Sequence, residues 1–294
     1  MMQNSIIGKL SDKVKSENLP VFRIVEIVGS AILTAELNPA NDSNNIYSVS
    51  KSYTSFASGL LFDRGLLDYK NSVYELFYED YPEDINDTWK NVTIKMVFDQ
   101  TVGINRFYLD MDSEDLWGYP YSDLIRNVLR EPFIYEPGTH FCYSDSNYYL
   151  AARIVEKLGG TDTSKLLWEA LFNPLKYQSH AWAADAFGHC MGATGLFLRT
   201  ADMAKFGRLL RDGGVYDGKR IISKEWIDLA TNHKTKEGCY SLGFWIQPGE
   251  GHFCCSGAFD QLIDINLNRD RVVAWSSYDK SGKVRGLRDL LREN

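Results

Sequence analysis

The chain has 294 residues, of which 44% are hydrophobic and 24% are charged, a composition that is ordinary for a folded globular protein. Its formal net charge is −7, and it has no cluster of basic residues of the kind that binds a phosphate backbone, so we expect no nucleic-acid partner. No apolar stretch is long enough to cross a bilayer, so we also expect no association with a membrane.

Two features of the sequence, the N-terminus and the cysteines, indicate where in the cell the protein is located. Residues 1–20 contain no uninterrupted apolar run after a basic start, so the sequence predicts no signal peptide and a cytoplasmic protein. Five cysteines are scattered along the chain, an odd number that is typical of free thiols in a reducing compartment. No cysteine or histidine spacing resembles a zinc site, so we expect neither a metal nor a cofactor, and the oligomeric state stays open.

The N-terminal quarter contains a predicted helix, a hairpin and a second helix. Apolar residues recur with helical spacing over residues 5–17. Two β-rich runs, "VFRIVEIV" at 21–28 and "AILTAEL" at 31–37, are separated by a Gly-Ser pair, which predicts a hairpin. After a polar loop, apolar residues from Tyr53 to Leu61 follow the i, i+3, i+4, i+7, i+8 pattern of one helical face, which Gly65 ends.

The rest of the chain divides into a helical middle and a β-rich tail. Residues 69–180 have helical patterns and loops with little strand alternation, and two more helices follow residue 190. The tail from residue 240 has strand-like patterns instead, and it predicts four successive strands with turns between them: "YSLGFWIQ", "GHFCCSGAF", "QLIDINLN" and "RVVAWSSY". An amphipathic helix over 281–294 closes the chain, with Val284, Leu287, Leu290 and Leu291 along one side.

Strands at both ends of the chain and helices between them favour an α+β fold. We expect the N-terminal hairpin to join the C-terminal strands in one antiparallel sheet of about five strands, flanked by the terminal helices. The sequence then predicts a discontinuous sheet domain made of residues 1–68 and 181–294. The remaining residues, 69–180, form an inserted and mostly helical domain.

The stretch "NNIYSVSKSY", residues 44–53, places a serine and a lysine three residues apart at the start of the second predicted helix. Residues at i and i+3 share a helical face, so the Ser48 hydroxyl and the Lys51 amine can meet. A hydroxyl is a poor nucleophile until a base takes its proton, and a lysine can be that base if its surroundings keep it partly neutral. The four residues alone favour a plainer interpretation, a capping serine with a solvated lysine.

Five segments resemble, in the same order, the motif regions of the serine β-lactamase and penicillin-binding-protein superfamily, especially its branch of β-lactamase-related serine hydrolases. The S-x-x-K motif at Ser48 is the nucleophile motif of that superfamily. The similar segments cover roughly residues 46–277 and are "YSVSKSYTSFASGLLFDRG", "VTIKMVFDQTVGI", "EPGTHFCYSDSNYYLAARIVEKLGG", "MGATGLFLRTADMAKFGRLLRDGG" and "SGAFDQLIDINLNRDRVVAW". The resemblance implies a β-lactamase/transpeptidase-like fold.

The resemblance also implies roles for individual residues. Ser48 would be the acylated nucleophile, Lys51 its general base, and Tyr143 the phenol that protonates the leaving group. Asp145 stands where many members have Asn; as an ionised carboxylate it only accepts hydrogen bonds and would raise the pKa of the lysine, which implies a shift in substrate handling. The oxyanion hole would consist of the backbone N–H groups of Ser48 and Ala258.

The third motif departs most from the family pattern. Many members carry Lys or His, then Thr or Ser, then Gly, whereas this chain has Cys255, Ser256 and Gly257. The glycine lets a substrate lie close to the strand and Ser256 keeps a hydroxyl, but neutral Cys255 cannot replace a cation that holds a substrate carboxylate. We therefore expect a substrate that is neutral or apolar at that end.

Together these observations predict a serine hydrolase that acts through an acyl-enzyme on a small-molecule ester or amide. Two related alternatives stay open: a true β-lactamase or DD-peptidase, and a catalytically degenerate member that binds a ligand without turning it over. A further alternative is an interaction protein whose Trp and Tyr clusters form a docking surface, although the sequence offers little for it.

Overall fold

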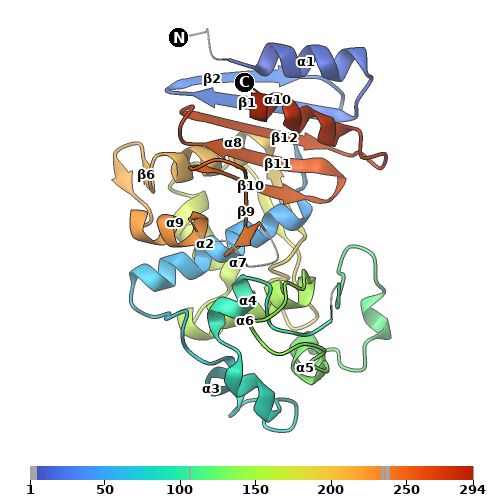
Figure 1. Ribbon diagram of the computed structural model, residues 1–294, viewed down its shortest axis with the longest axis vertical. Helices are drawn as coiled ribbons and strands as arrows, with labels where there is room; N and C mark the ends of the chain where they lie inside the picture. The colour runs from blue at the N-terminus through green and yellow to red at the C-terminus, as the bar shows by residue number, and fades with distance from the viewer. Residues whose placement is uncertain (1–4, 106, 233–234, 236–238, 294) are drawn as a thin grey trace.

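The computed structural model describes residues 5–105, 107–232, 235 and 239–293. Its main feature is a seven-stranded antiparallel sheet with the order β2-β1-β12-β11-β10-β9-β8 (Figure 1). The strands are β1 (Val21–Val28), β2 (Ala31–Glu36), β8 (Tyr240–Ser241), β9 (Phe244–Ile246), β10 (His252–Gly257), β11 (Gln261–Asn266) and β12 (Arg271–Ser277).

The two ends of the chain meet in this sheet, as the sequence predicts. β1 pairs with β12 along its whole length, and Val25 lies opposite Ala274. The sheet has seven strands rather than about five, partly because the run at 240–247 is divided by a turn. Leu242 and Gly243 both have positive φ there, so the chain reverses and forms the two short strands β8 and β9.

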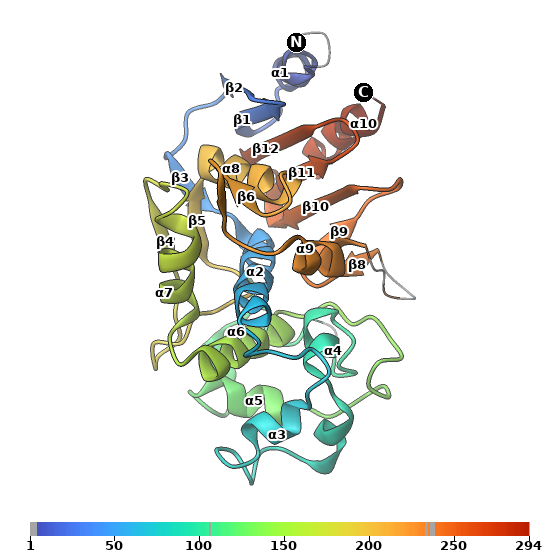
Figure 2. The ribbon, with the colours of Figure 1, turned by 90° about the vertical axis from the view of Figure 1, so that its left-hand side faces the viewer.

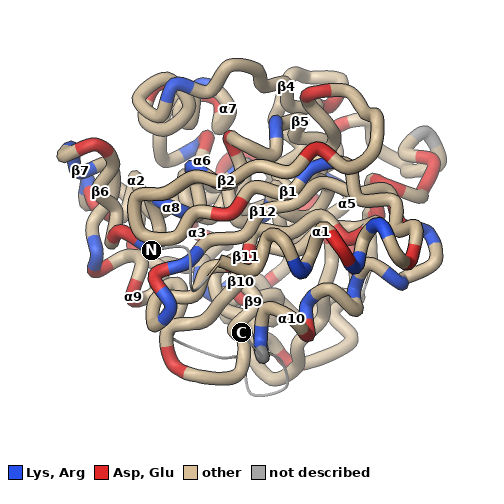
Figure 3. Tube along the Cα trace, turned by 90° about the horizontal axis from the view of Figure 1, so that it is seen from above, with Lys and Arg blue, Asp and Glu red and all other residues tan. Residues whose placement is uncertain are grey.

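The terminal helices α1 (Ile7–Ser16) and α10 (Leu287–Glu293) cover one face of the sheet and pack against Ile24, Val273 and Trp275. Both helices carry positive and negative residues, which are seen from above in Figure 3. The first N–H groups of α1 donate to the carboxylate of Glu26 on β1, at 3.0 Å from the backbone nitrogen of Ile7. Glu26 therefore supplies acceptors that the helix start lacks.

The opposite face of the sheet carries α8 (Thr200–Arg211), which lies close because Gly207 has no side chain to separate it from Val272. Below that layer runs α2 (Ser50–Asp63), which contacts α6, α7 and α9 and lies in the middle of the molecule (Figure 2). The sequence predicts one buried face for this helix, but every residue from Ser50 to Leu61 is buried. Its hydroxyl groups stay satisfied by bonding to neighbouring segments, as Thr54 does to the Gly192 carbonyl at 2.7 Å.

Residues 69–180 are mostly helical; α3 to α6 are drawn below α2 in Figure 1, whereas α7 lies beside α2. The elements of this part are α3 (Val73–Phe77), η2 (Asp87–Asn91), α4 (Ile94–Phe98), η3 (Leu116–Gly118), α5 (Leu124–Arg130), α6 (Asp145–Gly159), α7 (Thr163–Leu167) and η4 (Trp168–Phe172). The boundaries of the two predicted domains, at 68 and 181, stay a prediction.

None of the helices in the described part of the chain combines the length and apolar character that crossing a bilayer takes.

Small elements complete the fold and hold the start of α2 in place. The polar stretch expected to be a loop ends in β3 (Ser43–Asn45), which pairs with β5 (Leu196–Arg199) in a second sheet of order β3-β5-β4, with β4 at His180–Trp182. The backbone N–H of Ile46 continues this pairing to the Leu196 carbonyl at 2.9 Å. The remaining elements are η1 (Tyr47–Val49), β6 (Val215–Tyr216), β7 (Lys219–Arg220), α9 (Lys224–Thr231), η5 (Ala258–Asp260) and η6 (Val284–Gly286).

Replacing Glu26 by alanine should destabilise the protein by roughly 1–3 kcal/mol, because the buried N–H groups at the start of α1 lose their charged acceptor. Urea unfolding followed by tryptophan fluorescence measures the change. Glu36→Ala is the matched control, since Glu36 is an exposed glutamate on the adjacent strand and its pair with Arg23 is a surface pair. Equal stability losses in the two variants would contradict the capping role of Glu26.

Candidate active site

Ser48 lies in η1, immediately before α2, and is half-buried. The residue before it, Tyr47, has a φ of +48°, in the left-handed region that residues with a side chain rarely adopt. Two contacts hold Tyr47 there: its N–H donates to Asn45 Oδ1 at 2.9 Å, and its ring packs edge-on against Phe259 at 4.9 Å between centroids. The chain therefore turns sharply just before the serine, and this turn presents Ser48 at the wall of a cavity.

Lys51 lies one helical turn further on and is 1% exposed. Its Nζ donates to Ser48 Oγ at 2.9 Å, to Asp145 Oδ1 at 2.6 Å and to the Ala193 carbonyl at 3.1 Å. These three acceptors match the three donors of an ammonium group. The structure thus brings together the serine, the lysine and the aspartate that the sequence singles out.

The protonation of Lys51 depends on two opposing effects. Burial alone lowers the pKa of the ammonium group, but the neighbouring Asp145 carboxylate and Tyr143 outweigh burial, and the net effect is a raised pKa. Asp145 is itself buried at the first turn of α6, so its charge is poorly screened by solvent. The arrangement therefore holds Lys51 as an ammonium ion, and the lysine must lose a proton before it can act as a base.

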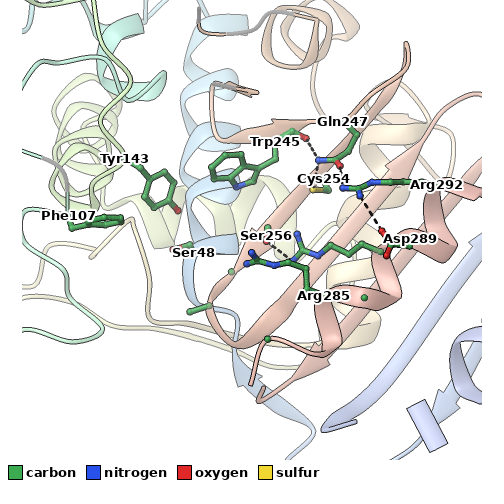
Figure 4. A pocket seen from close by; sticks show the side chains of 15 residues that line it. Ser48, Phe107, Tyr143, Trp245, Gln247, Cys254, Ser256, Arg285, Asp289 and Arg292 are labelled. Carbon is green, nitrogen blue, oxygen red and sulfur yellow. Dashed lines mark hydrogen bonds and ion pairs between the residues drawn. The ribbon is translucent and has the colours of Figure 1, made fainter. Parts of the chain in front are cut away.

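Tyr143 lies beside this pair, with its ring 4.9 Å from Lys51 Nζ. Its ring is stacked on Trp245 at 5.7 Å and meets Tyr240 edge-on at 6.0 Å. Figure 4 shows Tyr143 on the Ser48 side of the cavity, with Phe107 beyond it and Trp245 across from it. Aromatic packing therefore fixes the phenol close to the serine.

The third-motif strand β10 ends against the turn that carries Ser48. A Cβ atom added to Gly257 would lie 2.4 Å from the Ile46 carbonyl oxygen and 3.2 Å from the backbone nitrogen of Ser48. This contact permits no side chain at position 257 without a shift of the backbone. Ser256, Gly257 and Ala258 line the same cavity as Ser48 and Tyr143, and the cavity volume is about 960 Å³.

Cys255 lies apart from the other predicted residues. Because side chains alternate along a strand, it points to the opposite face of β10 from Ser256, and it is fully buried in the core beside Ser52. Burial raises the pKa of its thiol to about 12, so the thiol is neutral. The neighbouring Cys254 lines the cavity instead. The geometry therefore does not support direct contact between the Cys255 thiol and a ligand in this cavity.

A smaller cavity of about 310 Å³ adjoins Ser48 and has an acidic wall that the sequence analysis missed. Asp110, Asp112 and Asp145 place carboxylate oxygens within 4.8 Å of one another. Each already accepts a hydrogen bond: Asp145 from Lys51, Asp112 from Thr194 at 2.7 Å, and Asp110 from Ser113 at 2.6 Å. Burial raises the pKa of Asp112. The acid-rich stretch "DMDSED" at 110–115 was the available signal, but its position beside Ser48 follows from the fold.

The sequence analysis also missed a group of three arginines on the wall of the larger cavity, Arg285, Arg288 and Arg292. They come from η6 and α10, far along the chain from the motif regions. Arg288 donates to Ser256 Oγ at 2.9 Å, so it reaches the third-motif strand itself. The third motif, residues 255–257, contains no cationic side chain, as the sequence indicates. The wall of the cavity nevertheless carries three arginines.

The chain is similar to known proteins in both sequence and fold. A family model described as Beta-lactamase matches residues 39–293. A 6-aminohexanoate-dimer hydrolase of Paenarthrobacter ureafaciens is 25% identical over an alignment of 234 residues, and the match covers 72% of this chain and 57% of that relative. The chain thus spans little more than half of that relative's length.

Solved structures with low sequence identity share the fold. A Bacillus anthracis protein, provisionally assigned as a 6-aminohexanoate-dimer hydrolase, gives a TM-score of 0.82 at 16% identity and covers 99% of this chain and 82% of that one. The octameric penicillin-binding protein homologue from Pyrococcus abyssi gives 0.75 at 19% identity, with 99% of this chain and 78% of that one covered.

Replacing Gly257 by alanine should destabilise the protein by about 1–3 kcal/mol, since the new methyl group overlaps a backbone carbonyl rather than a movable side chain. Urea unfolding measures the change. Gly8→Ala in α1 is the control, because a Cβ there meets no atom within 4 Å and alanine favours the helix. A Gly257→Ala protein as stable as the parent would contradict the tight contact between β10 and the Ser48 turn.

Proposed function

Because the chain belongs to the β-lactamase family and has the β-lactamase/transpeptidase-like α+β fold predicted from its sequence, we propose that it is a serine hydrolase working through an acyl-enzyme on a small-molecule ester or amide. One observation carries this proposal: the buried Nζ of Lys51 lies 2.9 Å from the Ser48 hydroxyl oxygen. A solvated lysine with a capping serine, the plainer interpretation of the motif, does not fit a side chain that is 1% exposed.

In the proposed reaction, neutral Lys51 takes the proton of Ser48 while the serine oxygen attacks the carbonyl carbon of the substrate. The oxyanion that forms is held by the backbone N–H groups of Ser48 and Ala258, which lie on the two segments that Gly257 allows to approach each other. Tyr143 passes a proton to the leaving group, and the acyl-enzyme forms. Water then attacks the carbonyl carbon of the acyl-enzyme, the ester bond to Ser48 breaks, and the acid product is released while the Ser48 hydroxyl is restored.

The Asp145 carboxylate sets the pH range of this reaction. It stabilises the ammonium form of Lys51 and so lowers the fraction of neutral lysine at a given pH. Activity should therefore rise with pH as Lys51 loses its proton. An asparagine at this position would still accept a hydrogen bond but would not carry the charge.

An amide is a suitable substrate class, because the 25% identical relative is a hydrolase of the 6-aminohexanoate dimer. Binding without turnover is the alternative, supported by the neutral thiol of Cys255 in place of a third-motif cation. Labelling of the serine distinguishes the two functions.

A fluorophosphonate probe should label Ser48, and Ser48→Ala should abolish both the label and the hydrolysis of aryl esters. Peptide mass spectrometry locates the adduct. Ser50→Ala is the matched control, since Ser50 lies two residues away and its hydroxyl already donates to the Tyr47 carbonyl at 2.6 Å. An unlabelled parent protein, or a label that persists in Ser48→Ala, would overturn the proposed mechanism.

Asp145→Asn should move the acidic limb of the kcat/KM profile to lower pH, because removing the carboxylate lowers the pKa of Lys51 and leaves more neutral lysine at each pH. Initial rates on an aryl ester across the pH range measure this shift. Asp112→Asn should shift the profile much less, since Asp112 bonds to Thr194 rather than to the lysine. An unmoved acidic limb in Asp145→Asn would exclude Lys51 as the base.

A further inference from the structure

Gln100 is a fully buried glutamine that lines neither of the two cavities beside Ser48. It follows α4, and its backbone has a φ of +62°, in the left-handed region that residues with a side chain rarely adopt. Its carbonyl accepts from the N–H of Cys142 at 2.8 Å, which holds this backbone against the segment that leads to Tyr143. Such a conformation persists where surrounding contacts fix the backbone, and it commonly occurs near functional sites.

The side-chain amide of Gln100 binds the backbone of Ser144 at two points. The N–H of Ser144 donates to Gln100 Oε1 at 3.0 Å, and Gln100 Nε2 donates to the Ser144 carbonyl at 3.1 Å. Asn147 Nδ2 also donates to Oε1, at 2.7 Å. Because a backbone N–H only donates and a carbonyl only accepts, the Ser144 backbone fixes the orientation of the amide. These two bonds to Ser144 are called the Gln100 clamp below.

Ser144 stands between two residues of the proposed active site, Tyr143 and Asp145. Its N–H belongs to the peptide group that joins it to Tyr143, and its carbonyl belongs to the peptide group that joins it to Asp145. Each peptide group is planar and includes the Cα atoms at both of its ends. The Gln100 clamp therefore fixes the Cα positions of Tyr143 and Asp145 together.

Both of these residues need an exact position relative to Lys51. Asp145 Oδ1 accepts from Lys51 Nζ at 2.6 Å, and the Tyr143 ring lies 4.9 Å from the same nitrogen. The attraction between a carboxylate and an ammonium group weakens as they separate, and a phenol transfers a proton only within hydrogen-bond reach of the acceptor. A displacement of about 1 Å is therefore enough to slow the reaction.

A purely structural role for Gln100 would be to satisfy buried backbone groups, and the chain offers a clamp that does only this. Asn127 is 3% exposed and binds the backbone of Tyr121 in the same two-way manner. Its Nδ2 donates to the Tyr121 carbonyl at 2.6 Å, and the N–H of Tyr121 donates to its Oδ1 at 3.2 Å. Tyr121 lines neither cavity beside Ser48, so Asn127 provides a matched comparison.

We infer that Gln100 is a positioning residue of the proposed active site, whose amide holds the leaving-group acid Tyr143 and the lysine counter-ion Asp145 in place relative to Ser48. The inference rests on the proposed function and adds to it a residue that lines neither cavity. Gln100 acts on the reaction through two peptide groups rather than through contact with the reacting atoms.

The first test is the leaving-group dependence of Gln100→Met, a variant that keeps the length of the side chain but removes the amide. A 4-methoxyphenyl ester has a poorer leaving group than a 4-nitrophenyl ester and depends more on the proton from Tyr143. The kcat/KM ratio of 4-nitrophenyl acetate to 4-methoxyphenyl acetate should therefore rise about tenfold in the variant. Titration of Ser48 with the fluorophosphonate probe counts the active sites, so that both rates refer to folded protein.

The second test is the acidic limb of the kcat/KM profile of the same variant on 4-nitrophenyl acetate. A displaced Asp145 carboxylate stabilises the ammonium form of Lys51 less and so lowers the pKa of the lysine. The limb should move by about 0.5–1 pH unit toward lower pH, in the same direction as in Asp145→Asn. A loss of stability alone would lower the number of active sites without moving the limb.

Asn127→Leu is the matched control, because it removes an equivalent clamp from the Tyr121 backbone. It should lower the urea midpoint of unfolding, as Gln100→Met does, but leave the leaving-group ratio and the acidic limb at their parent values. Gln100→Asn is the second variant, for use where Gln100→Met does not fold. Its amide is one methylene group closer to the backbone and cannot hold both groups of Ser144, so both readouts should change in the same directions by smaller amounts.

An unchanged leaving-group ratio, or an unchanged acidic limb, in a folded Gln100 variant would overturn the inference, since the Gln100 clamp holds both peptide groups. Changes of the same size in Asn127→Leu would overturn it as well. A parent protein that neither takes the fluorophosphonate label on Ser48 nor hydrolyses the two esters would instead overturn the proposed function, and the inference with it.

Discussion

The burial of the Lys51 ammonium group constrains the whole molecule. A buried cation is costly unless acceptors surround it, and Lys51 finds three on segments that are distant in sequence: Ser48, Asp145 at the start of α6, and the Ala193 carbonyl. These bonds join the turn before α2, the helical part and the segment that leads into β5. Removing any one acceptor would leave part of the buried charge without a hydrogen bond, so the contacts around the proposed nucleophile Ser48 also hold these parts of the molecule together.

A second constraint acts on the backbone at either side of the proposed oxyanion position. Tyr47, before Ser48, and Phe259, after Ala258, both have left-handed φ values, and their rings contact each other. Gly257 allows the two segments to meet at a distance that no side chain would tolerate. Two strained residues that pack on each other can persist only where surrounding contacts over-determine the backbone, and such strain commonly gathers at functional sites.

Much of this fold could be predicted from local patterns, because alternation in the terminal strands and the Ser48–Lys51 spacing are properties of short segments. What could not be predicted depends on which segments meet. The sequence pattern of the closing helix indicates its apolar side, and Arg285, Arg288 and Arg292 lie off that side, where charged residues usually face water. Their spacing of three and four residues places them on one helical face, but only the tertiary fold sets that face against the cavity. The acidic wall at Asp110 and Asp112 was missed for the same reason.

The position of the arginines also explains why a neutral residue can stand at 255. Side-chain alternation turns position 255 into the core beside α2, where a cation would be desolvated in the same region as Lys51. A second buried cation there would repel the first and would need a counter-ion of its own. On α10 the positive charge instead stands at the cavity wall, partly hydrated and balanced by Asp260, and Arg288 reaches the third-motif hydroxyl from that side. Positive charge can then stand at the cavity wall without adding charge to the core that contains Lys51.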